Sequence, residues 1–412
     1  MSLAPARRAA PAPRGVARLL AAVPPDGRLV TLAEHLACFG PLEAGGDLIA
    51  AVEASGLRGR GGGAFQTGYK LRAVAAARGR PIVVVNCVEG EPASRKDGVL
   101  LRHAPHLVLD GAAAAAVALG ARSIIVAVGR SARAEQRIVA AMLEQRHDPV
   151  RWRLSTVPDG FVAGEETALL NALAGGTARP TLKPPFPCER GLGGAPTLVQ
   201  NTETLAHVAL IARFGADWFR SRGSDGEPGT ALVTVSGAVA RRGVYEIELG
   251  TRLSELVDQA GGASEPVSAF LVGGFFGGWT RDPSLRLLAA RGLGAGVVVA
   301  LPATSCGLRE SARVARYLAG ESAGQCGPCR HGLAALAGGL EGIATGRGAG
   351  EGDRLDRWAR QVSGRGACRH PDGAARFVRS TLAAFPEEIA LHLEQGRCSA
   401  GDRGILRVGR AA

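Results

Sequence analysis

The sequence predicts a multidomain α/β protein whose first domain is a parallel sheet with helices on its faces. Buried-type strands alternate with helical patterns from residue 81 to residue 173, and this alternation is typical of such sheets. A hairpin pattern near residue 230 then indicates a small mixed β domain, and the chain is helical from residue 308 onward. A chain of 412 residues is long enough for two to four domains.

The first domain follows a tail, residues 1–25, which is rich in Ala, Arg and Pro and is expected to be loose. Strands are expected at 81–87, 123–128 and 150–157, and helices at 104–119, 132–146 and 165–173. Ligands of parallel sheets bind beyond the carboxyl ends of the strands. Acidic stretches at 86–97 and 158–167 follow the first and third strands, so we expect the ligand site at that edge.

The three domains are expected at residues 26–222, 228–304 and 308–412. A further helix begins within residues 200–204, near the end of the first domain. The β domain is expected to contain a hairpin (230–239 and 243–250), a helix (253–259), strands at 269–272 and 297–301, and a loop at 275–280. Breaks at 320–327, 346–352 and 364–371 divide the last domain into a bundle of about four helices.

The composition restricts the class of protein. The chain is 46% hydrophobic and 21% charged, as in globular proteins, and it contains no apolar run long enough to span a bilayer. We therefore expect a cytoplasmic protein without direct membrane insertion, although it could lie at the periphery of a membrane complex. The net charge of +12 comes with only 4% aromatic residues and with arginines scattered along the chain. This pattern argues against a nucleic-acid partner.

The glycine-rich stretch 55–70 (S-G-L-R-G-R-G-G-G-A-F-Q-T-G-Y-K) is the strongest candidate for a ligand loop. Its glycines allow close approach of the backbone to a ligand, and Arg58, Arg60 and Lys70 add positive charge. It is not a Walker loop, because Tyr69 stands where the lysine belongs. It is not the dinucleotide fingerprint either, because the preceding residues read as a helix, with Asp47 as N-cap. A phosphate cradle of another kind remains, or a flexible turn.

Lysine is rare in this chain. Of 49 basic residues only Lys70, Lys96 and Lys183 are lysines, so 49 minus 3 leaves 46 arginines. Lysine is a compact point charge that fits phosphate sites and tight pockets. All three lysines lie in stretches selected on other grounds, which supports a role for them in the site. Lys183 lies in the Pro/Gly-rich passage 179–196, a long loop of the kind that is usually functional.

The cysteines of the helical domain indicate metal chemistry. Cys326 and Cys329 form a C-G-P-C run, and Cys368 follows with 38 residues between Cys329 and Cys368. A redox dithiol of the thioredoxin type needs a βαβ setting, so metal or iron–sulfur ligation is favoured over it. A pair of buried free thiols is the alternative. The remaining cysteines are interpreted as isolated core or incidental thiols: Cys38, Cys87, Cys188, Cys306 and Cys398.

Together these segments resemble the NADH-binding flavoprotein subunit of respiratory complex I and its relatives in NAD-linked hydrogenases and formate dehydrogenases. The matching segments lie in family order at 56–70, 86–97, 102–106 (R-H-A-P-H), 164–169 (G-E-E-T-A-L), 183–187 (K-P-P-F-P), 201–205 (N-T-E-T-L) and 321–332 (E-S-A-G-Q-C-G-P-C-R-H-G). The resemblance implies a Rossmann-like domain, a ubiquitin-like β-grasp domain of the SLBB type and a helical bundle with a 4Fe-4S cluster.

The resemblance also implies an NADH dehydrogenase (diaphorase) that passes hydride from NADH to FMN and electrons onward singly. The protein then supplies position and charge rather than a catalytic acid. In the family pattern the glycine loop and Lys70 wrap FMN, Phe65 and Phe186 stack on the nicotinamide nucleotide, and Glu91 lines the hydride-transfer cleft. The implied cofactor-binding residues are Gly59, Arg60, Gly61, Gly62, Gly63, Ala64, Phe65, Lys70, Asn86, Glu89, Glu91, Gly164, Glu165, Glu166, Lys183, Phe186, Asn201 and Thr204, and the implied cluster ligands are Cys326, Cys329 and Cys368.

The chain departs from the family pattern at three positions. Ala73 replaces a stacking aromatic residue, Val88 replaces an Asp that contacts the flavin, and Ala323 replaces the first cluster cysteine. These changes motivate an alternative reading, a non-catalytic scaffold or regulatory relative within a redox complex. The fourth cluster position is open: it could be unfilled, be filled by a residue such as His331, His370 or Cys306, or be missing as in a 3Fe-4S cluster. Absence of a cluster and a structural zinc are the further alternatives.

The resemblance finally implies partner subunits. A dehydrogenase that splits a hydride into single electrons needs an acceptor, and no second cluster motif is visible in this sequence. The basic balance of the chain favours an acidic ferredoxin-like or thioredoxin-like iron–sulfur protein as that acceptor, through electrostatic steering.

Overall fold

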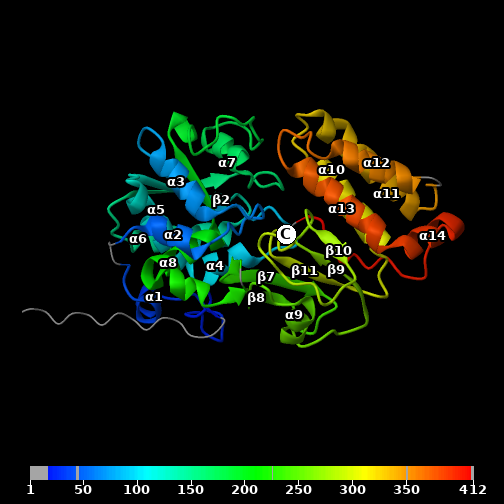
Figure 1. The fold of residues 1–412 in the computed structure, drawn as a ribbon, viewed down its shortest axis with the longest axis horizontal. Helices are drawn as coiled ribbons and strands as arrows, with labels where there is room; N and C mark the ends of the chain where they lie inside the picture. The colour runs from blue at the N-terminus through cyan, green and yellow to red at the C-terminus, as the bar shows by residue number, and fades with distance from the viewer. Residues whose placement is uncertain (1–16, 43–45, 225, 349–350, 410–412) are drawn as a thin grey trace, which may run out of the picture.

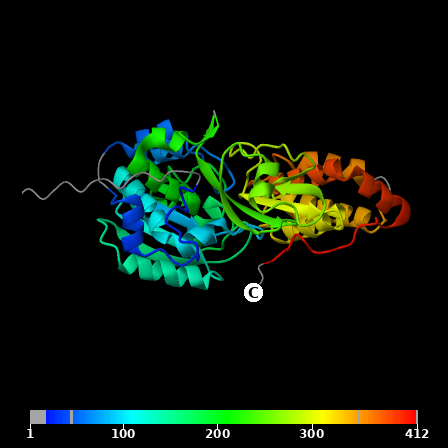
Figure 2. The ribbon, with the colours of Figure 1, turned by 90° about the horizontal axis from the view of Figure 1, so that it is seen from below.

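The structure is a computed structural model that describes residues 17–42, 46–224, 226–348 and 351–409. It contains an α/β domain, a β domain and a helical bundle, and the α/β domain and the bundle lie at opposite ends of the long axis (Figure 1 and Figure 2). The β domain contacts both of them, through α4 and β7 on one side and through α13 and β10 on the other. No helix in these residues combines the length and the apolar character needed to cross a membrane.

The α/β domain is built on a parallel four-stranded sheet with the order β3-β2-β1-β4. Its strands are β1 (Ile82–Cys87), β2 (Ser123–Gly129), β3 (Arg151–Val157) and β4 (Thr197–Asn201). Its helices are α1 (Leu32–Phe39), α2 (Leu48–Ser55), α3 (Thr67–Ala76), α4 (Lys96–His103), α5 (Pro105–Leu119), α6 (Arg133–Glu144), α7 (Glu166–Leu173) and α8 (Thr202–Arg220), with a 3-10 turn at Leu192–Gly194. The predicted parallel sheet is confirmed, and β4 is the strand that the prediction missed.

Hydrophobic burial explains the order of the central elements. The middle strands β1 and β2 are almost entirely buried runs of Val and Ile, as expected for strands covered on both faces. Helix α5 is rich in alanine and buried along most of its length against α8. Gly111 of α5 lies so close to α8 that an added Cβ would come within 1.8 Å of the Leu205 carbonyl oxygen. The small side chains of α5 therefore permit two helices to pack very closely above the sheet.

The β domain is a five-stranded mixed sheet with the order β10-β9-β11-β7-β8. Its elements are β7 (Thr230–Gly237), β8 (Gly243–Glu248), α9 (Leu253–Gln259), β9 (Val267–Val272), β10 (Gly278–Thr280) and β11 (Val297–Pro302), preceded by the short pair β5 (Gly223–Ser224) and β6 (Glu227–Pro228). The hairpin, the helix and both further strands are confirmed. Residues 275–280, predicted as a loop, end in β10, because Gly278 to Thr280 pair with β9.

The bundle contains α10 (Gly307–Gly320), α11 (Leu333–Ala344), α12 (Glu351–Val362), α13 (His370–Ala384) and α14 (Pro386–Gln395), and a π-turn, η2 (Pro328–Gly332), precedes α11. The predicted breaks occur, but these are five helices rather than about four. The prediction missed the turn at Phe385, whose ring is buried against Trp279 of β10. Pro386 then occupies the first position of α14, where a proline is tolerated.

The N-terminal tail lies only partly within the described residues, which begin at residue 17. From there the expectation of a loose segment is wrong, because Arg18 and Leu19 are buried. The backbone N–H groups of both residues donate to the carboxylate of Glu246 at distances of 2.9–3.0 Å, and Leu19 joins the hydrophobic core. This contact ties the start of the described chain to β8 of the β domain. The domain boundaries proposed from the sequence stay predictions.

Candidate functional site

The carboxyl edge of the sheet brings together polar groups from two neighbouring strands. Asn86 of β1 and Asn201 of β4 are paired residues in the parallel ladder. The Asn86 amide donates to the Gly164 carbonyl oxygen at 2.8 Å, and the Asn201 amide donates to Asp97 at 2.6 Å. Asn201 also caps α8, because its side-chain oxygen accepts from the N–H groups of Glu203 and Thr204. The loops that follow β1, β3 and β4 therefore meet at one place.

The glycine loop, residues 56–66, lies over this edge. It follows α2, whose N-cap is Asp47 and whose C-cap is Gly56 in the left-handed conformation (φ 69°), so the prediction of a loop that follows a helix is confirmed. Its base is closed by the Gly59 N–H donating to the Phe65 carbonyl at 2.8 Å, and its tip, residues 61–63, is exposed. An added Cβ on Gly61 would lie 3.2 Å from the Asn201 Cβ. The loop thus presents bare backbone directly above Asn201.

Ala64 is strained within this loop. Its φ of 48° makes it the one non-glycine residue with positive φ in the described part of the chain. The left-handed region costs an L-residue about 1–2 kcal/mol, and such strain is common at ligand sites. The closed base of the loop holds Ala64 in this conformation.

Arg60 does not add charge to the exposed tip, contrary to the prediction. Its side chain is buried, with Nη2 donating to the Thr230 carbonyl at 3.0 Å and Nε 3.7 Å from Glu203. Its backbone N–H donates to the Thr204 hydroxyl at 2.9 Å. Arg60 therefore anchors the glycine loop to α8 and to the β domain. A cavity of about 10 Å³, the size of one water, borders it beside Lys96.

A buried charge network lies beneath the loop, and sequence reasoning did not identify it. The Lys96 ammonium lies 2.8 Å from Asp97 and 3.0 Å from Glu203, and all three side chains are buried. Burial alone would lower the pKa of Lys96, but the two carboxylates outweigh it and raise that pKa above its usual value. Burial would raise the pKa of Glu203, yet Lys96, His207 and Arg60 lower it to about 2. The rarity of lysine was the available signal.

Two lysines and two glutamates form a second, more open set of charges, here called the lysine–glutamate group: Lys70, Glu165, Glu166 and Lys183. Glu166 accepts from Lys70 at 2.7 Å and from Lys183 at 2.8 Å, and Glu165 accepts from Lys183 at 2.9 Å. Burial opposes the charge of Glu166, but the two ammonium groups lower its pKa to about 2. Each of the four side chains is between 23% and 29% exposed. The structure thus brings together residues that are 113 positions apart in sequence, from Lys70 to Lys183.

Large apolar side chains are exposed beside this group. Phe65 is 63% exposed and Tyr69 60%, at the end of the glycine loop and in the first turn of α3. Leu182 is 75% exposed and Phe186 48%, on either side of Lys183. Single exposed apolar residues are ordinary, but several in two segments that flank one charged group indicate a surface for a ligand. Aromatic rings suit the flat face of a nucleotide base or nicotinamide.

The acidic loop after β1 holds its two glutamates differently. Glu89 accepts from the N–H groups of Asp97 and Gly98, at the start of α4, and from the Ser94 hydroxyl. Glu91 accepts from the N–H of Phe275 at 2.8 Å, in the β domain. Burial raises the pKa of Glu91 to about 7, against hydrogen bonds from Phe275 and Ala93 that lower it. Glu91 is therefore poised to change its charge near neutral pH, and it links two domains.

The three iron–sulfur-type cysteines lie at one end of the bundle. Cys326 precedes η2, Cys329 is buried within it, and Cys368 lies in the turn before α13. Burial raises the pKa of the Cys329 thiol to about 12, with further contributions from Cys326 and Cys368. For Cys326, burial is outweighed by the N–H groups of Ala367 and Cys329, so that its pKa is lowered. The three sulfurs are thus close enough to interact, and backbone N–H groups favour thiolate at Cys326.

The structure narrows the choice of a fourth ligand. Ala323 is buried and cannot coordinate, and His331 is exposed. Cys306 is excluded, because it lies at the N-terminus of α10 whereas Ala323 follows its C-terminus, and 14 residues of helix span about 21 Å. The Nε2 atom of His370 is hydrogen-bonded to the Leu318 carbonyl at 2.7 Å, which leaves its buried Nδ1 without a hydrogen-bond partner among the described residues. Of the residues suggested as a fourth ligand, His370 is therefore the one with a buried nitrogen that lacks a hydrogen-bond partner among the described residues.

The cysteine end of the bundle adjoins the loop after β3, at the carboxyl edge of the sheet in the α/β domain. The ring of Phe161, in the loop after β3, packs edge-on against Phe276 of the β domain at 4.7 Å and against His370 at 5.7 Å between centroids. The Phe161 N–H donates to Glu321 at 2.7 Å. Burial is the main cause of the raised pKa of the Cys368 thiol, and the negative charge of Glu165 raises it further. All three domains thus meet where the lysine–glutamate group approaches the cysteines.

Comparison with known proteins agrees with this arrangement. Residues 52–210 match the family described as Nuo51 FMN-binding domain, residues 232–274 match the SLBB domain, and residues 309–392 match the NADH-ubiquinone oxidoreductase-F iron-sulfur binding region. One NADH-quinone oxidoreductase F subunit of Rhizobium meliloti is 35% identical over 85% of this chain and 90% of its own length. The chain belongs to the family of NADH-quinone oxidoreductase F subunits. The F subunit of Mycobacterium tuberculosis is 36% identical, with 88% of each chain covered.

A solved structure extends the likeness of this NADH-quinone oxidoreductase family to hydrogenases. The NAD+-reducing NiFe-hydrogenase in its H2-reduced state superposes with a TM-score of 0.77 and 31% identity over 84% of this chain. The match spans 63% of that hydrogenase chain, so just under two thirds of its length is represented here. The predicted family, fold class and cofactor set are confirmed, including the SLBB-type β domain. Nothing in the comparisons supports the scaffold alternative.

The residues of the site fit the FMN of the family. The exposed backbone of residues 61–63 forms a cradle without side chains. A side chain at position 61 would press against Asn201. Likewise an added Cβ on Gly164 would lie 3.0 Å from the Val88 carbonyl oxygen. The iron–sulfur region fits a cluster in part. Three thiols lie near one another, but Ala323 supplies no fourth ligand. Of the two other departures from the family pattern, Val88 is buried and Ala73 is exposed.

Proposed function

We propose that this chain is an FMN-dependent NADH:acceptor oxidoreductase subunit that takes hydride from NADH and passes electrons onward singly. The observation that carries the proposal is the position of the lysine–glutamate group. It lies between exposed aromatic residues on one side and the cysteine end of the bundle on the other, at the carboxyl edge of the sheet. Nucleotide binding and electron exit therefore adjoin one another, as a hydride-to-electron converter requires.

The chain's own residues divide the binding work. The exposed backbone of the glycine loop, with Asn86, Asn201 and the capped N-terminus of α8, holds the flavin, and Lys70 holds its phosphate. Phe65 and Phe186 stack on the nicotinamide nucleotide, and Lys183 with Glu165 contacts its polar groups. Phosphate binding at a lysine replaces an ion pair that the free protein already makes. The lysines are thus held in place before ligand arrives.

FMN, when bound, accepts the hydride and releases its two electrons one at a time. The protein would contribute orientation, through the aromatic side chains of Phe65 and Phe186, and exclusion of water. Glu91 accepts a hydrogen bond from the Phe275 N–H of the β domain and lines the proposed hydride-transfer cleft. Its pKa is raised. Cys326, Cys329 and Cys368 would hold the iron–sulfur cluster, which supplies one-electron storage.

Redox partner subunits follow from membership of the family. For this chain we propose an acidic ferredoxin-like or thioredoxin-like iron–sulfur protein as the immediate acceptor, because the chain has a net charge of +12. We place it in the cytoplasm, either in a soluble enzyme or at the periphery of a membrane complex. Salt-sensitive electron transfer to an acidic partner supports this; transfer that does not change with ionic strength contradicts it.

Flavin absorbance tests the activity itself. Protein reconstituted with FMN should show the oxidised flavin spectrum, and anaerobic addition of NADH should bleach it. A protein that binds no FMN, or whose bound flavin stays oxidised in excess NADH, would instead be a scaffold. The measurement needs no partner subunit, so it separates loss of turnover from loss of assembly.

Two lysine variants test the assignment of ligands. Lys70 and Lys183 pair with the same carboxylate, Glu166, at nearly equal distances, so replacing either one removes a similar ion pair with Glu166. Lys183→Met also removes the ion pair with Glu165. Lys70→Met should weaken FMN binding more than NADH binding, and Lys183→Met should do the opposite. Each variant is the control for the other, with fluorescence quenching of FMN and inhibition by NAD+ as the two readouts. Equal effects of both variants on both ligands would overturn the assignment. Glu91→Gln should resemble Lys183→Met.

A further inference from the structure

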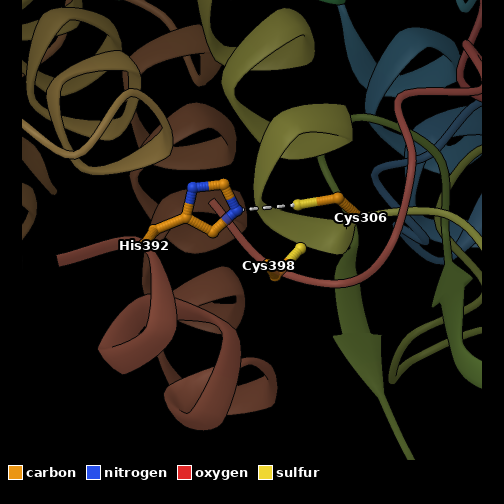
Figure 3. Close-up of side chains that lie close together, drawn as sticks. All are labelled: Cys306, His392 and Cys398. Carbon is orange, nitrogen blue, oxygen red and sulfur yellow. Dashed lines mark hydrogen bonds between the residues drawn. The ribbon is translucent and has the colours of Figure 1, made fainter. Parts of the chain in front are cut away.

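A second group of cysteines lies at the opposite end of α10 from the iron–sulfur cysteines. Cys306 is the N-cap of α10, His392 lies in α14, and Cys398 lies in the segment that follows α14. Their ligand atoms, two Sγ and one imidazole nitrogen, all lie within 4.8 Å of one another. Figure 3 shows the three side chains converging from three separate segments. The interpretation of Cys306 and Cys398 as isolated thiols is therefore wrong.

The immediate contacts are those of a compact polar site inside the bundle. The Cys306 Sγ is 3.4 Å from the His392 Nε2 and 3.3 Å from the Glu388 carboxylate. Cys306 and His392 are fully buried, and Cys398 is partly buried. Glu388 and His392 are four residues apart in α14, so both face Cys306. Two thiols, an imidazole and a carboxylate thus meet beside the hydrophobic core of the bundle.

We propose that Cys306, His392 and Cys398 bind one Zn²⁺ ion, with the carboxylate of Glu388 bordering the fourth coordination position. Cysteine thiolate and histidine nitrogen are the ligands that zinc prefers in proteins, and tetrahedral sites are built from such sets. Two thiolates and one Zn²⁺ carry no net charge, which suits burial in an apolar bundle. Hard cations such as Mg²⁺ and Ca²⁺ are disfavoured by sulfur ligands.

The site would fasten the end of the described chain to the bundle. The segment after Cys398 already pairs with the start of α10, since the Cys306 N–H donates to the Gly401 carbonyl at 2.8 Å. Glu310 of α10 accepts from the N–H groups of Ile405 and Leu406, each at 2.9 Å. Zinc would join α10, α14 and this segment at one point. The role is structural, because the length of α10 separates it from the iron–sulfur cysteines.

Metal analysis of the full-length protein tests the proposal. The iron–sulfur cysteines could also bind zinc, so the background is the full chain with Cys326→Ser and Cys329→Ser. We expect this protein, after dialysis, to retain one equivalent of zinc. Cys398→Ser in the same background should reduce the zinc to near zero. Cys188→Ser is the matched control, since Cys188 is a half-buried cysteine elsewhere, and it should leave the zinc unchanged.

Cobalt provides a second readout that needs no substitution at Cys306, His392 or Cys398. Co²⁺ added to the metal-free background protein should give the thiolate charge-transfer and visible absorption bands of a tetrahedral Cys2His site. Glu388→Gln, a nearly isosteric change, should alter the visible bands and leave the charge-transfer bands. Absence of zinc from the background protein, zinc that survives Cys398→Ser, or a disulfide between Cys306 and Cys398 found by thiol counting would each overturn the proposal.

Discussion

Replacing Lys96 by methionine should be among the most damaging single changes in the α/β domain. Methionine keeps the length and apolar stem of the side chain but removes the ammonium that lies 2.8 Å from Asp97 and 3.0 Å from Glu203. Two carboxylates are then left in the interior with one cation fewer. Removing one partner of a buried ion pair costs about 3–5 kcal/mol. For a domain of this size, such a loss lowers the melting temperature by about 6–20 °C.

The network beneath the glycine loop makes the effect specific. Glu203 is also 3.7 Å from the Nε of Arg60, and Arg60 anchors the loop through its backbone N–H. Neutralising one carboxylate together with the lysine, in Lys96→Met/Glu203→Gln, should therefore recover part of the stability lost in Lys96→Met. Lys96→Arg keeps the charge but should still destabilise, because the Lys96 Cδ would lie 3.1 Å from a Cβ built on Gly296 and little space remains.

Thermal unfolding followed by circular dichroism, with and without FMN, is the appropriate assay. The melting temperatures of wild type, Lys96→Met, Lys96→Arg and the double variant are compared at pH 7.5. A Lys96→Met protein that melts within about 2 °C of wild type would show that the ion pairs contribute little. A double variant no more stable than Lys96→Met would show that the stranded carboxylate is not the cause.

Three further predictions concern other residues. Ala64→Gly, at a φ of 48°, should stabilise the protein by about 0.5–1 kcal/mol, measured as a raised melting temperature; a lowered one would contradict the strain. Burial lowers the pKa of His207 to about 4, so its contribution to stability is present above pH 6.5 and is lost as the pH falls through 4. His207→Gln should therefore flatten the acid side of the stability profile by up to about 3 kcal/mol, and an unchanged slope between pH 6.5 and 4 would refute this. Ala323→Cys should slow the release of iron to a chelator after anaerobic reconstitution; an equal rate would mean that the fourth position is already filled.

The sequence was most informative where a local rule determines the structure. The apolar runs of β1 and β2 and the Asp47 cap of α2 were each predicted from neighbouring residues alone. Strand β4 was missed because it is five residues long and follows a proline-rich passage. Its place beside β1 depends on long-range pairing, which no local pattern records.

The site was predictable as a set of residues and not as a set of contacts. The lysine–glutamate group could be named in advance, but the direction of Arg60 could not, because its burial depends on Glu203 and on a carbonyl of the β domain. Cys306 and Cys398 were misread for a similar reason. They are 92 positions apart in the sequence, and only the packing of α14 and of the segment after it against the start of α10 brings them together.

The scarcity of lysine has a practical consequence for chemical probing. Lys96 is buried, so Lys70 and Lys183 carry the solvent-accessible side-chain amines of this chain, and both lie in the lysine–glutamate group. An acylating reagent or an amine cross-linker of moderate size would therefore modify the proposed nucleotide site almost selectively, without any engineered handle. Protection of these two amines by a bound nucleotide could be read by mass spectrometry, and a tethered partner could be mapped outward from the same two positions.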